Sequence, residues 1–250
     1  LSLMERMLAV SLEKAFGVRI QTPFERIPYE EAVGHYQTDK PDLRFRHFHR
    51  RKLNDVFEKT SFKVFAGALA NGKTIYSLTI PGANSAASRG ELDKSVAMAK
   101  SLGAQGLVWI KMGAQNMESP IEKFLSEQEQ SVLKSQNKPS DLLFICAEEP
   151  KMADRVMSEL QKKWAQIINH KPKEEHAFCW IYGFPLLEYV GEEKRWQATH
   201  NPFAAPMEED ISFLNTDPPK VRSQQYDLVL NGVELGSGSI RNHKSEIQKK

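Results

Sequence analysis

Hydrophobic residues recur at helical spacing along residues 1–16. Leu1, Met4, Leu8, Leu12 and Phe16 form one stripe, and charged residues lie between them. This pattern predicts an amphipathic helix that faces the core. The chain ends on the letters IQKK, which look like the start of another helix, and it has no initiator methionine. We therefore expect the sequence to be part of a longer protein.

Four short apolar runs in the middle of the chain predict β-strands. They are residues 62–70, 73–80, 106–112 and 141–147. The Asn71-Gly72 step between the first two runs is a strong signal for a two-residue hairpin turn.

Three helical patterns accompany these runs. Ser88 and Glu91 form a capping box, and Gly103 stands where a C-terminal cap is expected. A second helix is predicted to begin at Ser119, and apolar residues over 156–167 predict a third. The middle of the chain therefore reads as a self-contained α+β unit.

A polar connector over residues 172–177 ends this unit, and a new apolar strand follows it. We place the boundaries near residues 55 and 170. Residues 1–54 and 171–250 are too short and irregular to be separate domains, so we expect them to form one sheet domain interrupted by an α+β insertion domain at 55–170.

Composition is that of an ordinary globular protein, with 40% hydrophobic and 26% charged residues. No apolar run approaches the length needed to cross a bilayer, so we expect no membrane partner. A net charge of +2 neither supports nor excludes a nucleic-acid partner. Cys146 and Cys179 lie in separate apolar runs, which favours reduced core thiols and a cytoplasmic location.

The most informative stretch is YDLVLNGVELGSGSIR, residues 226–241. If Asn231-Gly232 is a two-residue turn, the strands pair Val229 with Glu234 and Asp227 with Gly236. Side chains alternate along strands, so two sets result. One face carries Asp227, Val229, Glu234 and Gly236, and the other carries Leu228, Leu230, Val233 and Leu235.

The leucine and valine face suits a core, which leaves both carboxylates on a face that is wet or occupied by a cation. Mg²⁺ fits, because it binds one or two carboxylates together with substrate phosphates. Strict alternation would put Arg241 on the opposite face, so we expect a register shift at Gly236 or Gly238. Such a shift would let Arg241 grip a carboxylate through two parallel hydrogen bonds. An edge hairpin with surface acids and a solvated arginine would give the same residues, and the sequence pattern alone leaves both interpretations open.

Several motifs together resemble a known family. YDLVLNGVELGSGSIR, YQTDKPDLRF at 36–45, FPLLEY at 184–189 and ATHNPFAAP at 198–206 are similar to stretches of bacterial-type aspartyl-tRNA synthetases, which are class II enzymes. PGANSAASRGELD and GAQGLVWIKM resemble the insertion domain of the same family. The resemblance covers essentially the whole chain.

The resemblance implies an α+β fold, with an antiparallel-sheet catalytic domain interrupted by the insertion. It implies a ligase of protein biosynthesis that uses ATP and Mg²⁺ to activate L-aspartate and then transfers it to tRNA, and a homodimer for the full-length enzyme. Glu234 matches an acid that holds ATP through Mg²⁺, and Asp227 matches an acid of the same metal region. Arg241 matches the arginine that binds the aspartate side chain, and His200 matches a histidine at the aspartate pocket. No residue is assigned as a catalytic acid or base.

This sequence departs from the family pattern at four positions, with Gln37 and Ser237 in place of glycines, Asn201 in place of a histidine and Gly183 in place of an aspartate. Asn201 cannot carry charge near pH 7, which changes any proton-dependent behaviour of its loop. The anticodon-binding domain and motifs 2 and 3 are not in the sequence, so we expect the chain alone to be inactive.

The main alternative is a non-catalytic tRNA- or protein-binding module built on the insertion domain. Smaller features favour structural roles. The run HFHRRK at 47–52 reads as a solvated charged stretch in preference to a metal or RNA site. Lys40 and Arg44 favour local ion pairs over substrate contact, and the four tryptophans favour core positions over base stacking.

Overall fold

The computed structural model describes residues 1–191 and 193–249, and the chain divides into two compact units. The outer unit comprises residues 1–34, 38–44 and 174–250, and the inner unit comprises residues 35–37 and 45–173. The main segment of the inner unit runs from residue 45 to 173, whereas the boundaries were expected near 55 and 170. The assignment of the inner unit as an inserted domain remains a prediction.

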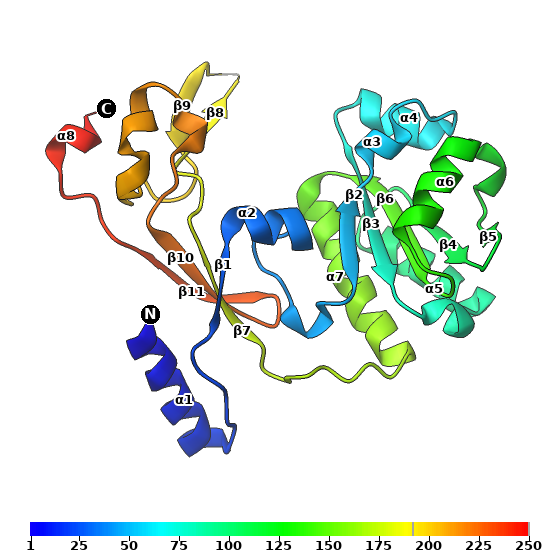
Figure 1. Cartoon of the computed structure of the whole chain (residues 1–250), viewed down its shortest axis with the longest axis horizontal. Coiled ribbons are helices and arrows are strands. Elements are labelled where there is room, and N and C mark those ends of the chain that lie inside the picture. The colour runs from blue at the N-terminus through cyan, green and yellow to red at the C-terminus, as the bar shows by residue number, and fades with distance from the viewer. Residues whose placement is uncertain (192, 250) are drawn as a thin grey trace. The chain divides into compact units, whose positions relative to one another are not determined.

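A four-stranded sheet forms the centre of the outer unit (Figure 1). Its strands, in spatial order, are β1 (Glu25–Pro28), β7 (Phe178–Tyr182), β10 (Gln225–Leu230) and β11 (Val233–Ser239). β1 and β7 are parallel, and the two other pairs are antiparallel. The first forty residues and the last eighty therefore contribute to one sheet.

Helix α1 (Ser2–Phe16) packs against this sheet through only part of its predicted stripe. Leu8 and Leu12 contact the cluster of Phe24, Phe178, Trp180 and Leu228. The other stripe residues are exposed, so the prediction that the whole stripe faces the core was wrong; they are Leu1, Met4 and Phe16.

The one buried residue of α1 is an acid. Glu5 is 2% exposed, and its carboxylate accepts a hydrogen bond of 2.9 Å from the indole nitrogen of Trp180. That bond pairs the indole N–H with one carboxylate oxygen, which offsets part of the cost of burying these groups.

The remaining elements of the outer unit are short. They are α2 (Tyr29–Glu31), the ribbon of β8 (Leu187–Val190) and β9 (Arg195–Ala198), the 3₁₀ segments η5 (Glu208–Asn215) and η6 (Pro218–Lys220), and α8 (Ser245–Gln248). Trp196 lies on β9 beside Tyr189 and is 39% exposed, so its predicted core position was wrong. The other three tryptophans are buried as predicted. A π-helical turn η1 (Ala32–Tyr36) and a 3₁₀ turn η2 (Leu43–Phe45) lie where the chain passes between the units.

An antiparallel five-stranded sheet forms the centre of the inner unit. Its strands, in spatial order, are β2 (His49–Lys52), β3 (Thr74–Ile80), β6 (Leu142–Glu148), β4 (Val108–Met112) and β5 (Met117–Glu118). The strands predicted over 73–80, 106–112 and 141–147 are confirmed. β6 is buried along its whole length, as its near-continuous apolar sequence predicts.

Helices cover both faces of this sheet, with a separate hydrophobic cluster on each. The helical elements are α3 (Asn54–Phe57), α4 (Lys63–Ala70), η3 (Ala83–Ala86), α5 (Arg89–Ser101), η4 (Glu122–Phe124), α6 (Glu127–Gln136) and α7 (Pro150–Ile167).

Both free cysteines are buried, and burial raises the pKa of Cys146 to about 12. The α+β class is confirmed, with antiparallel pairing throughout the sheet of the inner unit and in every pair of the outer sheet except β1 with β7.

The strand predicted over residues 62–70 is a helix instead. Phe62 at the N-cap of α4 and Phe65 and Leu69 within the helix contact the core at helical spacing, and the intervening alanines favour that conformation. Asn71-Gly72 consequently ends a helix and does not close a hairpin.

The helix predicted from Ser119 begins later. Residues Glu122–Phe124 form a single 3₁₀ turn, and α6 starts after Ser126. Ser126 and Glu129 form a full capping box, in which each side chain accepts a hydrogen bond from the backbone of the other. This reciprocal cap fixes the start of the helix.

The charged run at 47–52 is only partly solvated. Arg50 is 7% exposed and donates hydrogen bonds to Asp154, Ser158 and Gln161 of α7. Its role is therefore to tie β2 to α7, which corrects the interpretation of this run as a solvated stretch.

Candidate active site

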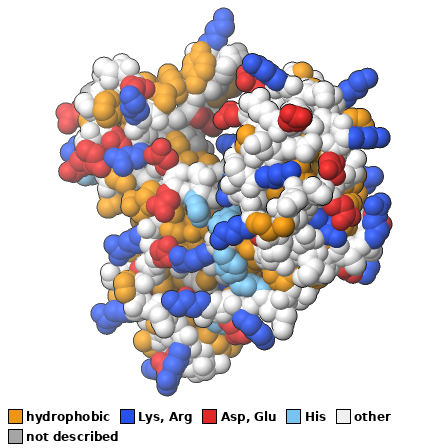
Figure 2. Space-filling model, turned by 45° about the vertical axis from the view of Figure 1, so that its right-hand side comes forward, with side chains coloured by type: hydrophobic (Ala, Val, Ile, Leu, Met, Phe, Trp, Pro, Cys, Tyr) orange, Lys and Arg blue, Asp and Glu red, His pale blue; other side chains and the backbone are white. Residues whose placement is uncertain are grey.

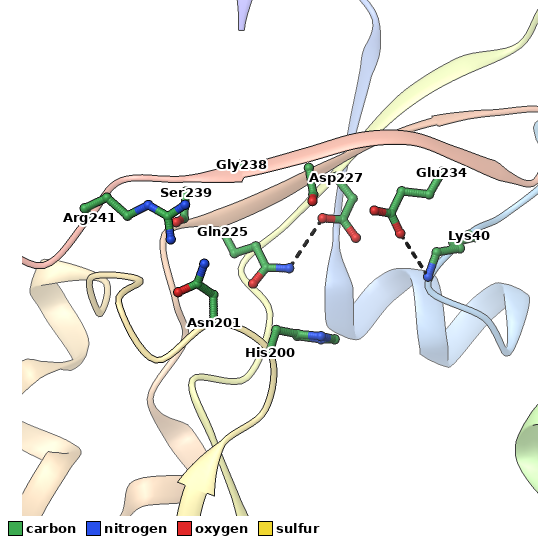
Figure 3. Close-up of a pocket in the computed structure, with 10 residues that line it drawn as sticks. Lys40, His200, Asn201, Gln225, Asp227, Glu234, Gly238, Ser239 and Arg241 are labelled. Atoms are coloured by element: carbon green, nitrogen blue, oxygen red, sulfur yellow. Dashed lines mark hydrogen bonds and ion pairs between the residues drawn. The ribbon is translucent and has the colours of Figure 1, made fainter.

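A pocket of about 330 Å³ lies in the outer unit, against the β10–β11 hairpin (Figure 3). Ten residues line it: Lys40, His200, Asn201, Gln225, Asp227, Glu234, Ser237, Gly238, Ser239 and Arg241. All four residues that were expected to bind substrate or metal are in this set. The structure therefore brings the predicted site residues together.

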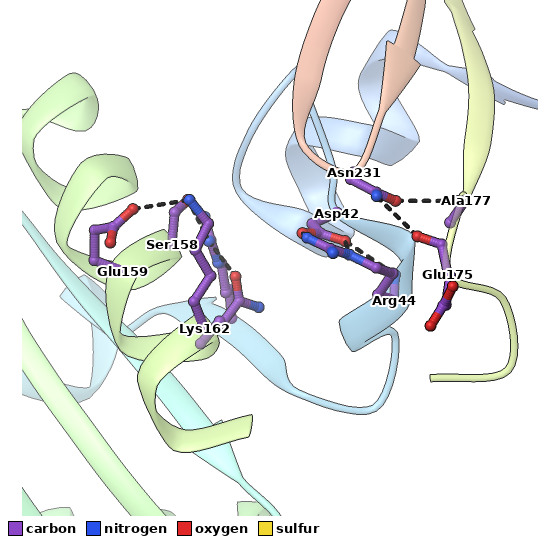
Figure 4. A network of polar contacts seen from close by, with 10 residues as sticks. Asp42, Arg44, Ser158, Glu159, Lys162, Glu175, Ala177 and Asn231 are labelled. Carbon is purple, nitrogen blue, oxygen red and sulfur yellow. Dashed lines mark hydrogen bonds and ion pairs between the residues drawn. The ribbon is translucent and has the colours of Figure 1, made fainter. Parts of the chain in front are cut away.

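The hairpin turn forms as predicted. Asn231 and Gly232 both have positive φ, of 53° and 82°, which is the conformation that an Asn-Gly pair favours. The side chain of Asn231 accepts from the Ala177 amide and donates to the Glu175 carbonyl (Figure 4). These contacts anchor the turn, so the register of the hairpin starts from a fixed point.

A bulge one position before the expected glycine changes that register. Leu230 pairs with Val233 and Val229 with Glu234, but Leu228 then pairs with Gly236, which leaves Leu235 as the extra residue. Neither Gly236 nor Gly238 has positive φ. The expected shift exists, but its predicted position was wrong.

The extra residue decides which side chains share the pocket face. Beyond the bulge, Asp227 lies opposite Ser237, and Gln225 lies opposite Ser239. Strand alternation then carries Arg241 to the same face as Glu234. The bulge therefore places Arg241 on the pocket face, whereas regular pairing would have placed it on the opposite face.

The predicted division into a core face and a wet face holds only in part. Leu228 is buried, whereas Val233 and Leu235 are 60% and 50% exposed. Val229, which shares the face of Asp227, is completely buried. The open part of the pocket face thus begins at Asp227 and Glu234 and runs away from the turn.

Asp227 and Glu234 form the acidic end of the pocket (Figure 3). Burial raises the pKa of the Asp227 carboxyl, and the charge of Glu234 raises it further. Gln225 partly opposes this effect, because its side-chain amide donates a 3.4 Å hydrogen bond to Asp227. The ionised form of Asp227 is therefore destabilised in the folded protein, and a bound cation would relieve that cost.

Lys40 neutralises part of this charge. Its ammonium lies 3.3 Å from Glu234 and 3.1 Å from Asp39. Burial lowers the pKa of Lys40, but its hydrogen bonds and ion pairs with Asp39 and Glu234 outweigh that effect and leave the pKa raised. The ion pair with Glu234 joins two segments that are far apart in the sequence.

Lys40 and Arg44, for which the sequence favours local ion pairs, differ in the structure. Arg44 makes a local two-pronged ion pair with Asp42, as predicted. Lys40 also pairs locally with Asp39 but points into the pocket as well. Gln225 and Ser239 were also missed, since only the strand register brings them to this face.

Arg241 lies at the opposite end of the pocket from the acids (Figure 3). Its backbone forms a bridge with Ala204, and the Asn242 amide donates to the Phe203 carbonyl at 2.8 Å. The guanidinium makes no hydrogen bond or ion pair with any residue within 1–191 or 193–249. A fixed backbone and an uncommitted guanidinium suit the binding of an anion.

Neutral polar groups surround this arginine. Asn201 uses its side-chain oxygen to accept from the Phe203 amide at 2.9 Å, which shapes the loop. Ser239 has a buried hydroxyl without a hydrogen-bond partner among the described residues. A ligand in the pocket could satisfy that hydroxyl.

His200 packs edge-on against the ring of Phe184, with ring centroids 5.3 Å apart. It lines the pocket as predicted, on the loop that follows β9. Among the described residues, no cluster of three or more histidine, cysteine or acidic side chains could hold a metal by itself. A cation here would need ligands from a substrate in addition to Asp227 and Glu234.

The family model for tRNA synthetases class II (D, K and N) matches residues 1–250, so the chain belongs to that family. The chain is 41% identical over 248 residues to an aspartate–tRNA(Asp/Asn) ligase of Elusimicrobium minutum, and the match covers 98% of this chain and 42% of the relative.

Two further relatives agree. The identity is 42% over 250 residues with an aspartate–tRNA(Asp/Asn) ligase of Syntrophomonas wolfei, covering 99% of this chain and 42% of the relative. It is 38% over 252 residues with an aspartate–tRNA ligase of Lysinibacillus sphaericus, covering 100% of this chain and 43% of the relative. The chain thus spans less than half the length of the relatives that it matches.

Proposed function

We propose that this chain forms part of an aspartate–tRNA ligase, in which it contributes to the binding of L-aspartate and ATP. The observation that carries the proposal is the pocket itself, in which an uncommitted Arg241 lies at one end and two acids lie at the other. ATP use follows from membership of the class II family. The names of the relatives support aspartate as the amino acid and tRNA as the acceptor.

Arg241 is the residue that recognises the aspartate side chain. A guanidinium offers two parallel N–H donors that match a carboxylate, and no described group competes for them. Ser239 and the side-chain amide of Asn201 line the pocket as well and can hydrogen-bond the same substrate. His200 lines the same pocket and lies beside Asn201 on the same loop.

Asp227 and Glu234 are the residues that would hold Mg²⁺. Such an ion supplies charge neutralisation for the phosphates of ATP. The two carboxylates share one face, and burial and the charge of Glu234 raise the pKa of Asp227. A divalent cation between them would stabilise both in the ionised form. A cation at Glu234 would compete with Lys40, which would then be available to a substrate anion.

A non-catalytic binding module built on the inner unit is the alternative function. Such a module gives no reason for the outer unit to gather an arginine, a lysine and two acids around one pocket. The proposal extends to a homodimeric full-length enzyme with tRNA as its macromolecular partner. No described helix is long and apolar enough to span a membrane.

The test uses a chimera in which this chain replaces the matching segment of the Elusimicrobium minutum ligase. Aspartate-dependent exchange of pyrophosphate into ATP measures activation. Arg241→Lys keeps the charge but loses the paired donors. Arg241 is exposed in this structure, so the loss is that of a hydrogen bond to a charged group, about 1.5–3 kcal/mol. We expect the KM for aspartate to rise, or kcat to fall, by at least about tenfold, while the KM for ATP stays unchanged.

Arg195→Lys is the matched control, because Arg195 lies on the exposed ribbon and pairs with Glu193. It should leave both constants unchanged. If the Arg241→Lys chimera keeps the kinetic constants of this control and still rejects asparagine, Arg241 does not bind the aspartate side chain.

A further inference from the structure

The inner unit contains a second and larger hollow that the proposed function does not use. It has a volume of about 670 Å³ and lies between α4, the C-terminal end of α5 and the strands β4 and β6. All of its lining residues lie within 62–147, so the groove belongs to the inner unit alone. Its size is in the range of small-ligand clefts, roughly 300–1,000 Å³.

The floor of the groove is hydrophobic. Phe65, Leu107 and Ile145 are buried beneath it, and they belong to the two clusters that cover the sheet. Val64 on the lip is 59% exposed. Apolar surface at an open groove gains free energy when a hydrocarbon covers it.

The rim of the groove is basic. Lys73 and Lys100 line it, and no acidic residue within the described part of the chain does. Lys73 is committed to Glu148 at 3.1 Å, and the other oxygen of Glu148 accepts from the Gln105 amide at 2.6 Å. Both carboxylate oxygens of Glu148 therefore already have partners, and Lys73 already has an anion.

Lys100 is the cation that remains available. It lies in the last turn of α5 and is exposed, and it makes no ion pair or hydrogen bond with any residue that the structure describes. The negative end of the helix dipole stabilises its charge there. A hydrophobic floor beside an uncommitted cation is complementary to a ligand that has an apolar chain and one anionic group.

We propose that this groove binds a small anionic amphiphile, with its hydrocarbon chain over the floor and its carboxylate or phosphate head at Lys100. The site is independent of the pocket in the outer unit. A carboxylate head and a phosphate head would pair with Lys100 in the same way, so one probe with each head tests which of them the groove binds.

The experiment is a titration of the ¹⁵N-labelled chain with decanoate, decyl phosphate and uncharged 1-decanol, each below its aggregation concentration. Both anions should shift amides near the groove, at residues 64–68, 105–108 and 145–147. Decanol should bind at least about fivefold more weakly, since it lacks the negative charge that would pair with Lys100. If decanol binds as tightly as both anions, or if neither anion shifts these amides, the proposal is overturned.

Two variants locate the site. Gly67→Leu places a side chain in open space at the groove, since a Cβ at Gly67 meets no atom within 4 Å. Gly67 lies in α4, where glycine is a poor helix former, so this variant should fold and should block binding. Lys100→Glu should weaken binding of both anions at least fivefold.

Lys134→Glu is the matched control for the charge change. Lys134 is exposed in the last turn of α6, as Lys100 is in α5, but it does not line the groove. Binding that survives Gly67→Leu, or that Lys134→Glu weakens as much as Lys100→Glu does, would show that the anions bind elsewhere.

Discussion

Gly238 gives the most direct test of how the hairpin is built. It lies opposite Tyr226 in the β10–β11 pair. A Cβ at this position would lie 2.7 Å from the Tyr226 hydroxyl oxygen and 2.9 Å from Cε2 of the ring, well inside van der Waals contact. The sequence predicts a register shift at Gly236 or Gly238, but at Gly238 the ring of Tyr226 occupies the space that a side chain would need.

The substitution Gly238→Ala therefore forces the ring to move. Tyr226 packs edge-on against Trp180, with ring centroids 5.7 Å apart, and it contacts the cluster beneath α1. Overpacking of this kind costs about 1–3 kcal/mol. The same methyl group at Gly236 would meet no atom within 4 Å. Gly236→Ala should therefore be neutral or stabilise the strand by about 0.5–1 kcal/mol, because alanine loses less backbone entropy.

The expected difference between the two alanine variants is at least about 1 kcal/mol in the free energy of unfolding. Amide hydrogen exchange in β10 measures it for the outer unit alone, which avoids treating a chain of two units as two-state. In a Tyr226→Ala background, the penalty of Gly238→Ala should vanish. Equal effects of the two alanine variants, or a penalty that persists without the tyrosine ring, would refute this explanation.

Two further predictions concern buried charge. Arg50→Met should destabilise the inner unit by roughly 1–3 kcal/mol, because Gln161 and Ser158 lose their donor. The neighbouring Arg51→Met, which loses only an exposed bond to a backbone carbonyl, should change the stability little; amide hydrogen exchange in the inner unit measures both variants. Burial and Glu234 raise the pKa of Asp227 in the folded protein, so its ionisation costs stability once the pH exceeds the pKa that Asp227 has in the unfolded chain. Asp227→Asn should therefore stabilise the outer unit at pH 7, and this gain should disappear as the pH falls below the unfolded-state pKa. An equal gain at pH 3 and pH 7 would contradict the assigned cause.

The sequence predicted those parts of the site that depend on local pattern. The Asn-Gly turn and the pairing of Val229 with Glu234 follow from neighbouring residues, and so does the common face of Asp227 and Glu234. Lys40 could not be placed in this way, because its contact with Glu234 joins distant segments. Gln225 was missed for a related reason, since the register beyond the bulge decides what it faces.

The errors in the fold have a common physical origin. A short apolar run such as 62–70 fits both a strand and a helix, and tertiary contacts decide between them. The stripe of α1 identified a helix correctly but did not reveal which of its residues have a packing partner. Likewise, the charge of Arg50 suggested solvent, although three polar partners on α7 make its burial favourable.

The bulge at Leu235 connects these observations to the proposed chemistry. Without it, Ser237, Ser239 and Arg241 would share a face with Leu228, and the acids would lie alone on the other side of the hairpin. Because β10 keeps a continuous register with β7 on its other edge, the irregularity is confined to β11. The site residues of β10 therefore stay fixed by the sheet, while one extra residue in β11 moves a cation onto the acidic face. A pocket that separates a positive end from a negative end thus depends on a local departure from regular pairing, which the alternation of side chains alone could not reveal.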